Sequence, residues 1–210
     1  MTNRNRLAIL GVGNVLCTDD GLGPMAVDRL SRDYSASEGI AVLDGGTLGL
    51  SLLPIIEDSD QVLIVDAVRM DAPAGTLVFL EGADVLPAVR LRLSVHQVGV
   101  ADLLDAARIR GRLPRKLLLL GLVPESIELG YELSAAVSEA LPRLVEAIVD
   151  AVRELGFELT PVCTPVSGSS PVESRREWPR SGRRSVPRES GTRGPATDHD
   201  ASLRSGDRHG

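Results

Sequence analysis

The chain has 210 residues, which is enough for one domain with a well-buried core. Aromatic residues make up only 2% of it, so the core has to be built from Leu, Val, Ile and Ala. The formal net charge of −6 is unevenly spread, because residues 164–210 hold nine Arg against six Asp or Glu, which leaves −9 for residues 1–163. An acidic body argues against a nucleic acid or an anionic membrane surface as the main partner.

The first apolar segments alternate between strand-like and helix-like patterns. Residues 7–12 (LAILGV) form a short continuous apolar run, which is typical of a buried strand. Residues 20–34 then place apolar side chains at helical spacing, and residues 40–43 predict a second short strand. Residues 50–57 fit a short helix if Pro54 lies in its first turn or kinks it.

The same alternation continues further along the chain. Residues 61–65 (QVLIV) and 116–122 (KLLLLGL) predict two more buried strands. Residues 76–80 predict a strand that follows a short turn, so it can run antiparallel at an edge of the sheet. Residues 98–109 are amphipathic, and residues 133–155 predict a long helix that Pro142 bends. Strands separated by helices indicate an α/β fold, with a mainly parallel sheet and helices on both faces.

Composition changes sharply at Cys163, which divides the chain into a domain, 1–163, and a tail, 164–210. The tail is rich in Ser, Arg, Gly and Pro, and Trp178 is its only aromatic residue. It cannot bury enough apolar surface to offset its ordering entropy, so we expect it to be disordered. Its arginines could instead form a docking arm, but a solvated tail is the favoured interpretation.

The cysteine count and the apolar runs bear on localisation. Cys17 and Cys163 are too sparse for a disulfide framework. No run reaches the ~18–20 apolar residues that a membrane span needs, and the N-terminal run is too short for a signal peptide. We therefore expect a monomeric cytoplasmic protein that binds neither membrane nor nucleic acid.

The segment GVGNVLCTDDGLG (11–23) begins like a dinucleotide fingerprint. The third glycine of that fingerprint would fall on Leu16. Asp44, the candidate for the ribose-binding acid, lies farther along than the usual ~20 residues. A nucleotide site is therefore the weaker interpretation of this segment.

Two acids follow predicted strands. Thr18 or Asp19 can cap the helix that follows, which accounts for one acid of the Asp19–Asp20 pair and leaves Asp20 near the carboxyl end of the first strand. Asp66 directly follows residues 61–65, where an acid can also be a simple turn residue. If the third strand lies beside the first, as in flavodoxin-like sheets, Asp20 and Asp66 share one crevice.

His96 is the only histidine outside the tail. Ser94 and Gln97 fit a capping box, which predicts that His96 lies in the first turn of a helix. The positive end of the helix dipole disfavours imidazolium, and a metal ligand needs the neutral ring. With Asp20 and Asp66 it would complete three protein ligands, the pattern of a catalytic metal site that could hold zinc, nickel or iron.

The segment Asp44-Gly45-Gly46-Thr47 ends the second predicted strand. Two glycines serve equally well in a simple turn and in a surface against which a substrate peptide lies. Other nucleophile schemes are poor, because the chain has no G-x-S-x-G elbow and Cys17 fits a packing role.

Five sequence blocks resemble those of the hydrogenase maturation proteases. They are GVGNVLCTDDGLG at 11–23, DGGT at 44–47, VDA at 65–67, SVHQVGVADLL at 94–104 and LGLVPES at 120–126. Their order and spacing agree over residues 7 to about 159. The resemblance implies a three-layer fold whose mainly parallel sheet has five strands.

The resemblance also implies an endopeptidase, aspartic-type or nickel-dependent, that cleaves the large-subunit precursor of nickel–iron hydrogenase near its C-terminus after nickel insertion. The family's metal-contacting positions fall on Asp20, Asp66 and His96, and nickel is expected to arrive with the precursor. Some members have Glu at the first position, so Asp20 shortens that ligand by one methylene. We expect the substrate also to contact Gly45, Gly46, Thr47 and Gln97.

Two alternatives use the same residues. A nickel-binding chaperone would hold the loaded precursor without releasing a peptide. A related peptidase would cleave the precursor of a different metalloenzyme.

Overall fold

We describe the fold from a computed structural model, which describes residues 6–90 and 99–162. All of these residues belong to one compact unit of the chain. The predictions for the tail, 164–210, and for His96 and Gln97 fall outside the described residues.

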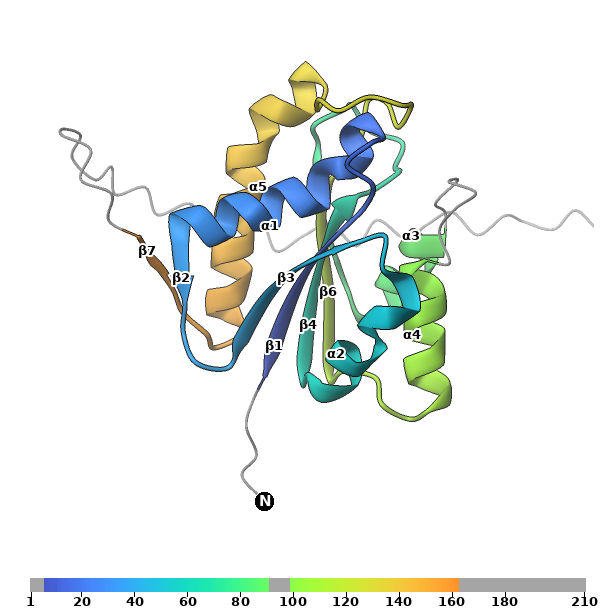
Figure 1. Cartoon of the computed structure of the whole chain (residues 1–210), viewed down its shortest axis with the longest axis vertical. Helices are drawn as coiled ribbons and strands as arrows, with labels where there is room; N and C mark the ends of the chain where they lie inside the picture. The colour runs from blue at the N-terminus through green and yellow to red at the C-terminus, as the bar shows by residue number, and fades with distance from the viewer. Residues whose placement is uncertain (1–5, 91–98, 163–210) are drawn as a thin grey trace, which may run out of the picture. The chain divides into compact units, whose positions relative to one another are not determined.

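A five-stranded, mainly parallel sheet forms the centre of the unit (Figure 1). Four strands are parallel, and the edge strand β5 (Leu77–Glu81) is antiparallel to its neighbour β6 (Lys116–Leu122), as the short turn before it predicts. The continuous apolar runs at 7–12, 61–65 and 116–122 form its three central, largely buried strands, because a parallel sheet covered on both faces needs continuous apolar sequence. In sheet order the strands are β3 (Ile40–Gly46), β1 (Leu7–Val12), β4 (Gln61–Ala67), β6 (Lys116–Leu122) and β5 (Leu77–Glu81).

Helices cover both faces of this sheet (Figure 1). One apolar cluster joins Leu63 and Val65 of β4 to the helices α1 (Leu22–Asp33) and α5 (Ala135–Glu154). The opposite face of β4, with Val62 and Ile64, packs with the helices of a second cluster. These are α2 (Leu53–Asp58), α3 (Val85–Arg90) and α4 (Val100–Ile109). The predicted three-layer α/β fold is therefore confirmed.

A second sheet was not predicted. It pairs β2 (Tyr34–Ala36) with β7 (Leu159–Pro161) in antiparallel register. These strands directly follow α1 and nearly follow α5, so they tie the ends of the two helices together. Each of these two strands has only three residues, and most of the six are exposed, so the sequence shows too little periodicity to predict them.

The helices differ in detail from their predicted extents. Pro54 lies in the first turn of α2, as expected, after the short 3-10 helix η2 (Gly49–Leu52). Pro142 lies inside α5. The helix α4 begins at Val100, with Gly99 in an extended conformation as its N-cap, whereas the predicted capping box of Ser94 and Gln97 lies outside the described residues.

Within the described part of the chain, no helix has the length and apolar character needed to cross a membrane. Three short 3-10 helices complete the unit. They are η1 (Thr18–Gly21), which leads into α1, η2, and η3 (Gly82–Asp84), which leads into α3.

Candidate active site

The two candidate acids lie at the same edge of the sheet. Strand β1 pairs with β4 in parallel, with Gly11 opposite Val65, so their carboxyl ends are neighbours. Asp66 is the next residue of β4, and Asp20 lies in η1, which packs against β4. The first strand therefore lies beside the third, which is the arrangement under which Asp20 and Asp66 share one crevice, and both acids lie where open α/β sheets bind their ligands.

Asp66 is completely buried at the end of β4. Side chains alternate along a strand, so Asp66 shares the face of Ile64, which belongs to the apolar cluster on the α4 side. Its partner in β6 is Gly121, where a Cβ would lie 2.0 Å from the Asp66 carbonyl oxygen. Only glycine therefore allows β6 to approach the backbone of Asp66 this closely.

Asp20 is held by the turn that follows β1. Asp20 is only 8% exposed, and its carboxylate accepts a hydrogen bond from the backbone N–H of Asn14 over 2.8 Å. Gly13 has a φ of +136°, and a Cβ there would lie 1.8 Å from the carbonyl oxygen of Asp20. This turn can therefore close only with glycine at position 13.

Gly23 accounts for another glycine of the same segment. A Cβ at Gly23 would lie 2.2 Å from the carbonyl oxygen of Val12 and 2.4 Å from that of Val65. The first turn of α1 thus sits directly on the ends of β1 and β4. Close packing therefore explains Gly13 and Gly23 without a bound nucleotide. A dinucleotide site was also the less favoured interpretation of the sequence.

Asp19 does not cap α1, contrary to the prediction for Thr18 or Asp19. The N-cap of that helix is Gly21, and no side chain caps it. The fully buried Asp19 carboxylate instead accepts three backbone N–H groups from the loop between β6 and α5. The donors are Glu125 at 2.8 Å, Ser126 at 3.2 Å and Ser134 at 2.7 Å.

Further bonds join the same two loops. The Thr18 hydroxyl donates to the carbonyl oxygen of Ser126 over 2.7 Å, and the Thr18 N–H donates to that of Gly130 over 2.8 Å. Gly130 in turn donates its N–H to the carbonyl oxygen of Leu16 over 2.9 Å. The loop of residues 123–134 therefore lies against the turn that carries Asp20. Sequence analysis found it only as the block LGLVPES, without a role.

The DGGT segment reaches the same edge. The Asp44 carboxylate accepts the N–H of Gly46 over 2.9 Å, and the carbonyl oxygen of Gly46 accepts the N–H of Gly13 over 3.0 Å. Gly46 has a φ of +40°, which favours glycine. The turn interpretation thus explains part of the motif, and contact of Gly45, Gly46 and Thr47 with substrate stays a prediction.

His96 lies outside the described residues, and the next described helix along the chain is α4. The carboxyl-terminal end of α4 lies near the start of β4. Arg110, which directly follows α4, forms an ion pair with Glu57 of α2, and α2 is the helix that precedes β4. The opposite end of α4, at Val100, therefore points toward the carboxyl edge (Figure 1). Val100 also belongs to the apolar cluster of Ile64.

Residues 6–90 and 99–162 contain no group of three or more His, Cys, Asp or Glu side chains arranged to hold a metal ion. The described part of the predicted ligand set consists of two carboxylates, Asp20 and Asp66. Oxygen donors alone suit hard cations, so a nickel ion here would need further ligands from His96 or from the molecule that carries it.

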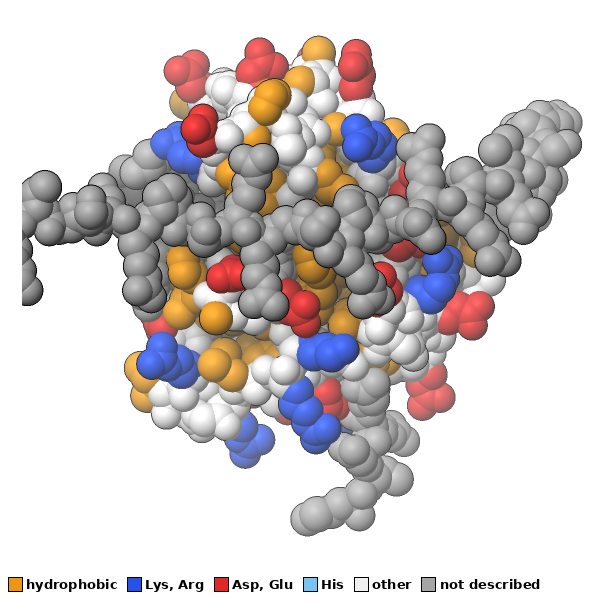
Figure 2. Space-filling model, turned by 180° about the vertical axis from the view of Figure 1, so that it is seen from behind, with side chains coloured by type: hydrophobic (Ala, Val, Ile, Leu, Met, Phe, Trp, Pro, Cys, Tyr) orange, Lys and Arg blue, Asp and Glu red, His pale blue; other side chains and the backbone are white. Residues whose placement is uncertain are grey.

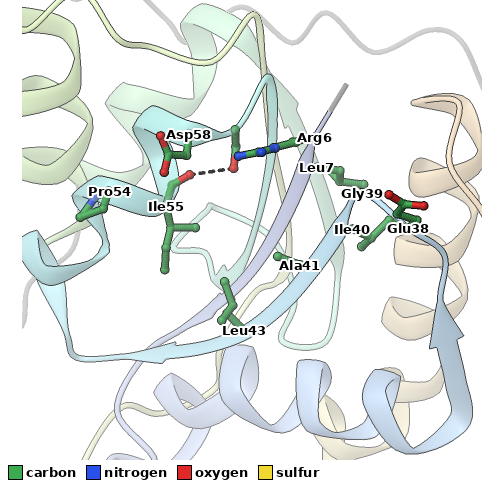
Figure 3. A pocket seen from close by; sticks show the side chains of 11 residues that line it. Arg6, Leu7, Glu38, Gly39, Ile40, Ala41, Leu43, Pro54, Ile55 and Asp58 are labelled. Carbon is green, nitrogen blue, oxygen red and sulfur yellow. Dashed lines mark hydrogen bonds between the residues drawn. The ribbon is translucent and has the colours of Figure 1, made fainter. Parts of the chain in front are cut away.

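A hollow of about 640 Å³ lies elsewhere (Figure 3). It is lined by residues at the amino-terminal ends of β1 and β3, such as Leu7 and Ile40, and by Ile55 and Asp58 of α2. Neither Asp20 nor Asp66 lines it, so this hollow is separate from the candidate site.

Known proteins resemble this chain over most of its length. The sequence profile described as hydrogenase maturation protease matches residues 24–151, a range that includes Asp66 and His96 and begins just after Asp20. The hydrogenase 2 maturation protease of Escherichia coli (strain K12) is 37% identical over 158 residues, which cover 74% of this chain and 96% of that protein. The chain belongs to the hydrogenase maturation protease family.

Other relatives of this maturation protease extend the comparison. The HupD protein of Rhizobium leguminosarum bv. viciae, a hydrogenase expression/formation protein, is 33% identical over 74% of this chain and 78% of its own length. The solved structure of the hydrogenase maturating endopeptidase HybD from E. coli has a TM-score of 0.70 at 36% identity, and the match covers 74% of this chain and 97% of HybD. HybD from Thermococcus kodakarensis has a TM-score of 0.58 at 29% identity, over 70% and 98% of the two chains. Membership of the family assigns this maturation protease a peptidase role in hydrogenase maturation.

Proposed function

We propose that this maturation protease removes the C-terminal extension of a nickel–iron hydrogenase large-subunit precursor after nickel has been inserted. Asp20, Asp66 and His96 would contact the nickel that the precursor already holds. The substrate would also contact Gly45, Gly46, Thr47 and Gln97. We further propose that the enzyme works as a monomer in the cytoplasm, without nucleic acid or membrane.

The observation that carries this proposal is the parallel pairing of β1 with β4. It brings Asp20 and Asp66, 46 positions apart in the chain, to one edge of the sheet. Asp66 is buried and Asp20 is almost buried, so neither acid is an ordinary solvated surface residue. Buried acids at the ligand-binding edge of an α/β sheet are candidates for chemistry rather than for solubility.

Docking on the nickel would act as a check that assembly is complete. A precursor without nickel would present no cation to the two carboxylates, so the attraction that favours binding of the loaded precursor would be missing. A loaded precursor would supply that cation and would position one peptide bond beside the site. Specificity would then come from the metal and its protein ligands together.

Hydrolysis adds the hydroxyl of a water molecule to the carbonyl carbon of the scissile bond and a proton to the departing amine. The carboxylate of Asp20 or Asp66 can accept the proton of the attacking water as a general base. A nickel ion supplied by the substrate can instead polarise the carbonyl group as a Lewis acid. Either route uses the same three side chains.

The test is a cleavage assay on purified large-subunit precursor, with and without its nickel, read by mass spectrometry. We expect one defined C-terminal peptide to be released only from the loaded precursor. Release from both forms would contradict the nickel check. Tight binding of the loaded precursor without release would favour a nickel-binding chaperone. Neither binding nor release would indicate a different metalloenzyme precursor as the substrate.

A further inference from the structure

Large apolar side chains are exposed on the loops that surround Asp20 and Asp66. Each of these loops follows the carboxyl end of a parallel strand: β1, β3, β4 or β6. We call them the apolar rim; its members are Leu16, Leu48, Leu50, Met70, Leu129 and Tyr131. Single exposed apolar residues need no explanation, but a group gathered at one end of a protein marks a surface that binds something.

Hydrogen bonds between the loops make the rim one connected surface. Gly130, between Leu129 and Tyr131, donates to the carbonyl oxygen of Leu16 over 2.9 Å. The loop after β1 is tied to the end of β3, just before Leu48, by the Gly13–Gly46 bond. The loop after β4, which carries Met70, is tied to the end of β6 by a bond of 2.8 Å from Gly75 to Val123.

The exposed charges at this end of the unit are mainly acidic. Arg69 is the one exposed base of the described loops there, against five exposed acids. These acids are Asp44, Asp71, Glu125, Glu128 and Glu132. Bases gather instead at the other end of the sheet, where Arg108, Arg110, Arg112, Arg115 and Lys116 surround the start of β6. Figure 2 shows acidic and hydrophobic side chains at the top of one face of the molecule; Lys or Arg side chains lie just below them and further down, where acidic side chains are also present.

We propose that the apolar rim docks a segment of the precursor whose apolar side chains are flanked by Lys or Arg. This inference rests on the proposed function, because a peptide bond that reaches Asp20 and Asp66 has to pass over the rim. Apolar contact would supply the affinity, and the acidic side chains would select a basic partner and speed its approach.

The same charges argue against other occupants. Two copies of this chain meeting rim to rim would set like charges opposite each other, which is unfavourable in a symmetric contact. An anionic bilayer would likewise be repelled by five acids against one base. A basic, apolar protein segment satisfies both features of the rim.

The experiment compares full-length variants for binding to nickel-loaded large-subunit precursor, with cleavage read separately. Leu129→Ser and Ile109→Ser form a matched pair, because both side chains are 87% exposed and only Leu129 belongs to the rim. We expect Leu129→Ser to weaken binding and Ile109→Ser to leave it unchanged; Leu129→Ser combined with Tyr131→Ser should weaken it further, to about tenfold in all. The melting temperatures should all agree, since these side chains are exposed.

The charge is tested in the same way. Glu125→Lys with Glu128→Lys should weaken binding and flatten its dependence on salt, and Glu146→Lys on the exposed side of α5 should not. Binding equal to wild type in both rim variants would overturn the inference. If only the apolar variant loses affinity for the precursor, the inference that the docked segment carries Lys or Arg is overturned. A wild-type protein that binds the precursor through the rim but never cleaves it would contradict the proposed function and leave the docking surface supported.

Discussion

The Asp19 carboxylate lies 2.7 Å from the backbone nitrogen of Ser134, although 115 residues separate them in the chain. Ser134 is the N-cap of α5, and its hydroxyl oxygen accepts the N–H of Val137. Asp19 thus fixes the start of α5 against the turn that carries Asp20. Two adjacent acids have different tasks, one holding a loop in place and the other belonging to the candidate site.

Asp19→Ala should destabilise the fold more than any change of an exposed acid. The substitution leaves three buried backbone N–H groups without their acceptor. We expect a loss of about 3 kcal/mol in the free energy of unfolding, measured with urea. Asp44→Ala is the control, since exposed Asp44 accepts one such bond and should cost far less. Equal losses from the two variants would contradict this role of Asp19.

Gly23→Ala should separate α1 from the sheet. The new Cβ would lie within 2.4 Å of two backbone oxygens, which cannot rotate away as a side chain can. We expect a loss of about 3 kcal/mol or more in stability, together with loss of cleavage. Gly111→Ala serves as the comparison, because nothing lies within 4 Å of its Cβ and only its φ of +66° opposes the change. Its cost should be about 1 kcal/mol.

Asp66→Asn should abolish cleavage without unfolding the protein. Asparagine has nearly the same size as aspartate, so the packing at the end of β4 is kept while the negative charge is lost. We expect the rate of peptide release to fall at least about 100-fold, as for the loss of a catalytic acid or base. The melting temperature shows whether the fold survives. Unimpaired cleavage by a folded Asp66→Asn protein would remove Asp66 from the site.

His96→Ala should reduce recognition of nickel rather than of the precursor as such. We expect cleavage to stop and binding of the nickel-loaded precursor to weaken, while the weaker binding of the nickel-free form stays unchanged. His199→Ala, in the tail, is the matched control and should behave as wild type. A similar effect of His96→Ala on both forms of the precursor would argue against a metal-contacting role.

Particular residues illustrate what the sequence could predict. The runs LAILGV and QVLIV identified two central strands, because a strand buried on both faces needs uninterrupted apolar sequence. Asp66 was a candidate because it follows such a run directly. The capping role for Thr18 or Asp19 was wrong, since the partners of Asp19 lie more than 100 residues away and no local pattern reveals them.

The sequence alone thus determined the α/β class, the antiparallel edge strand and the family, because the spacing of apolar residues and the order of the motifs can be read from short stretches of the chain. Only the tertiary structure decided three features: β1 lies beside β4, Asp19 accepts hydrogen bonds from the loop before α5, and hydrogen bonds connect the loops of the apolar rim. Those features depend on backbone hydrogen bonds and close glycine contacts between distant segments. Such contacts exist only once the chain has folded, so their physical basis is the packing of the whole sheet with its helices.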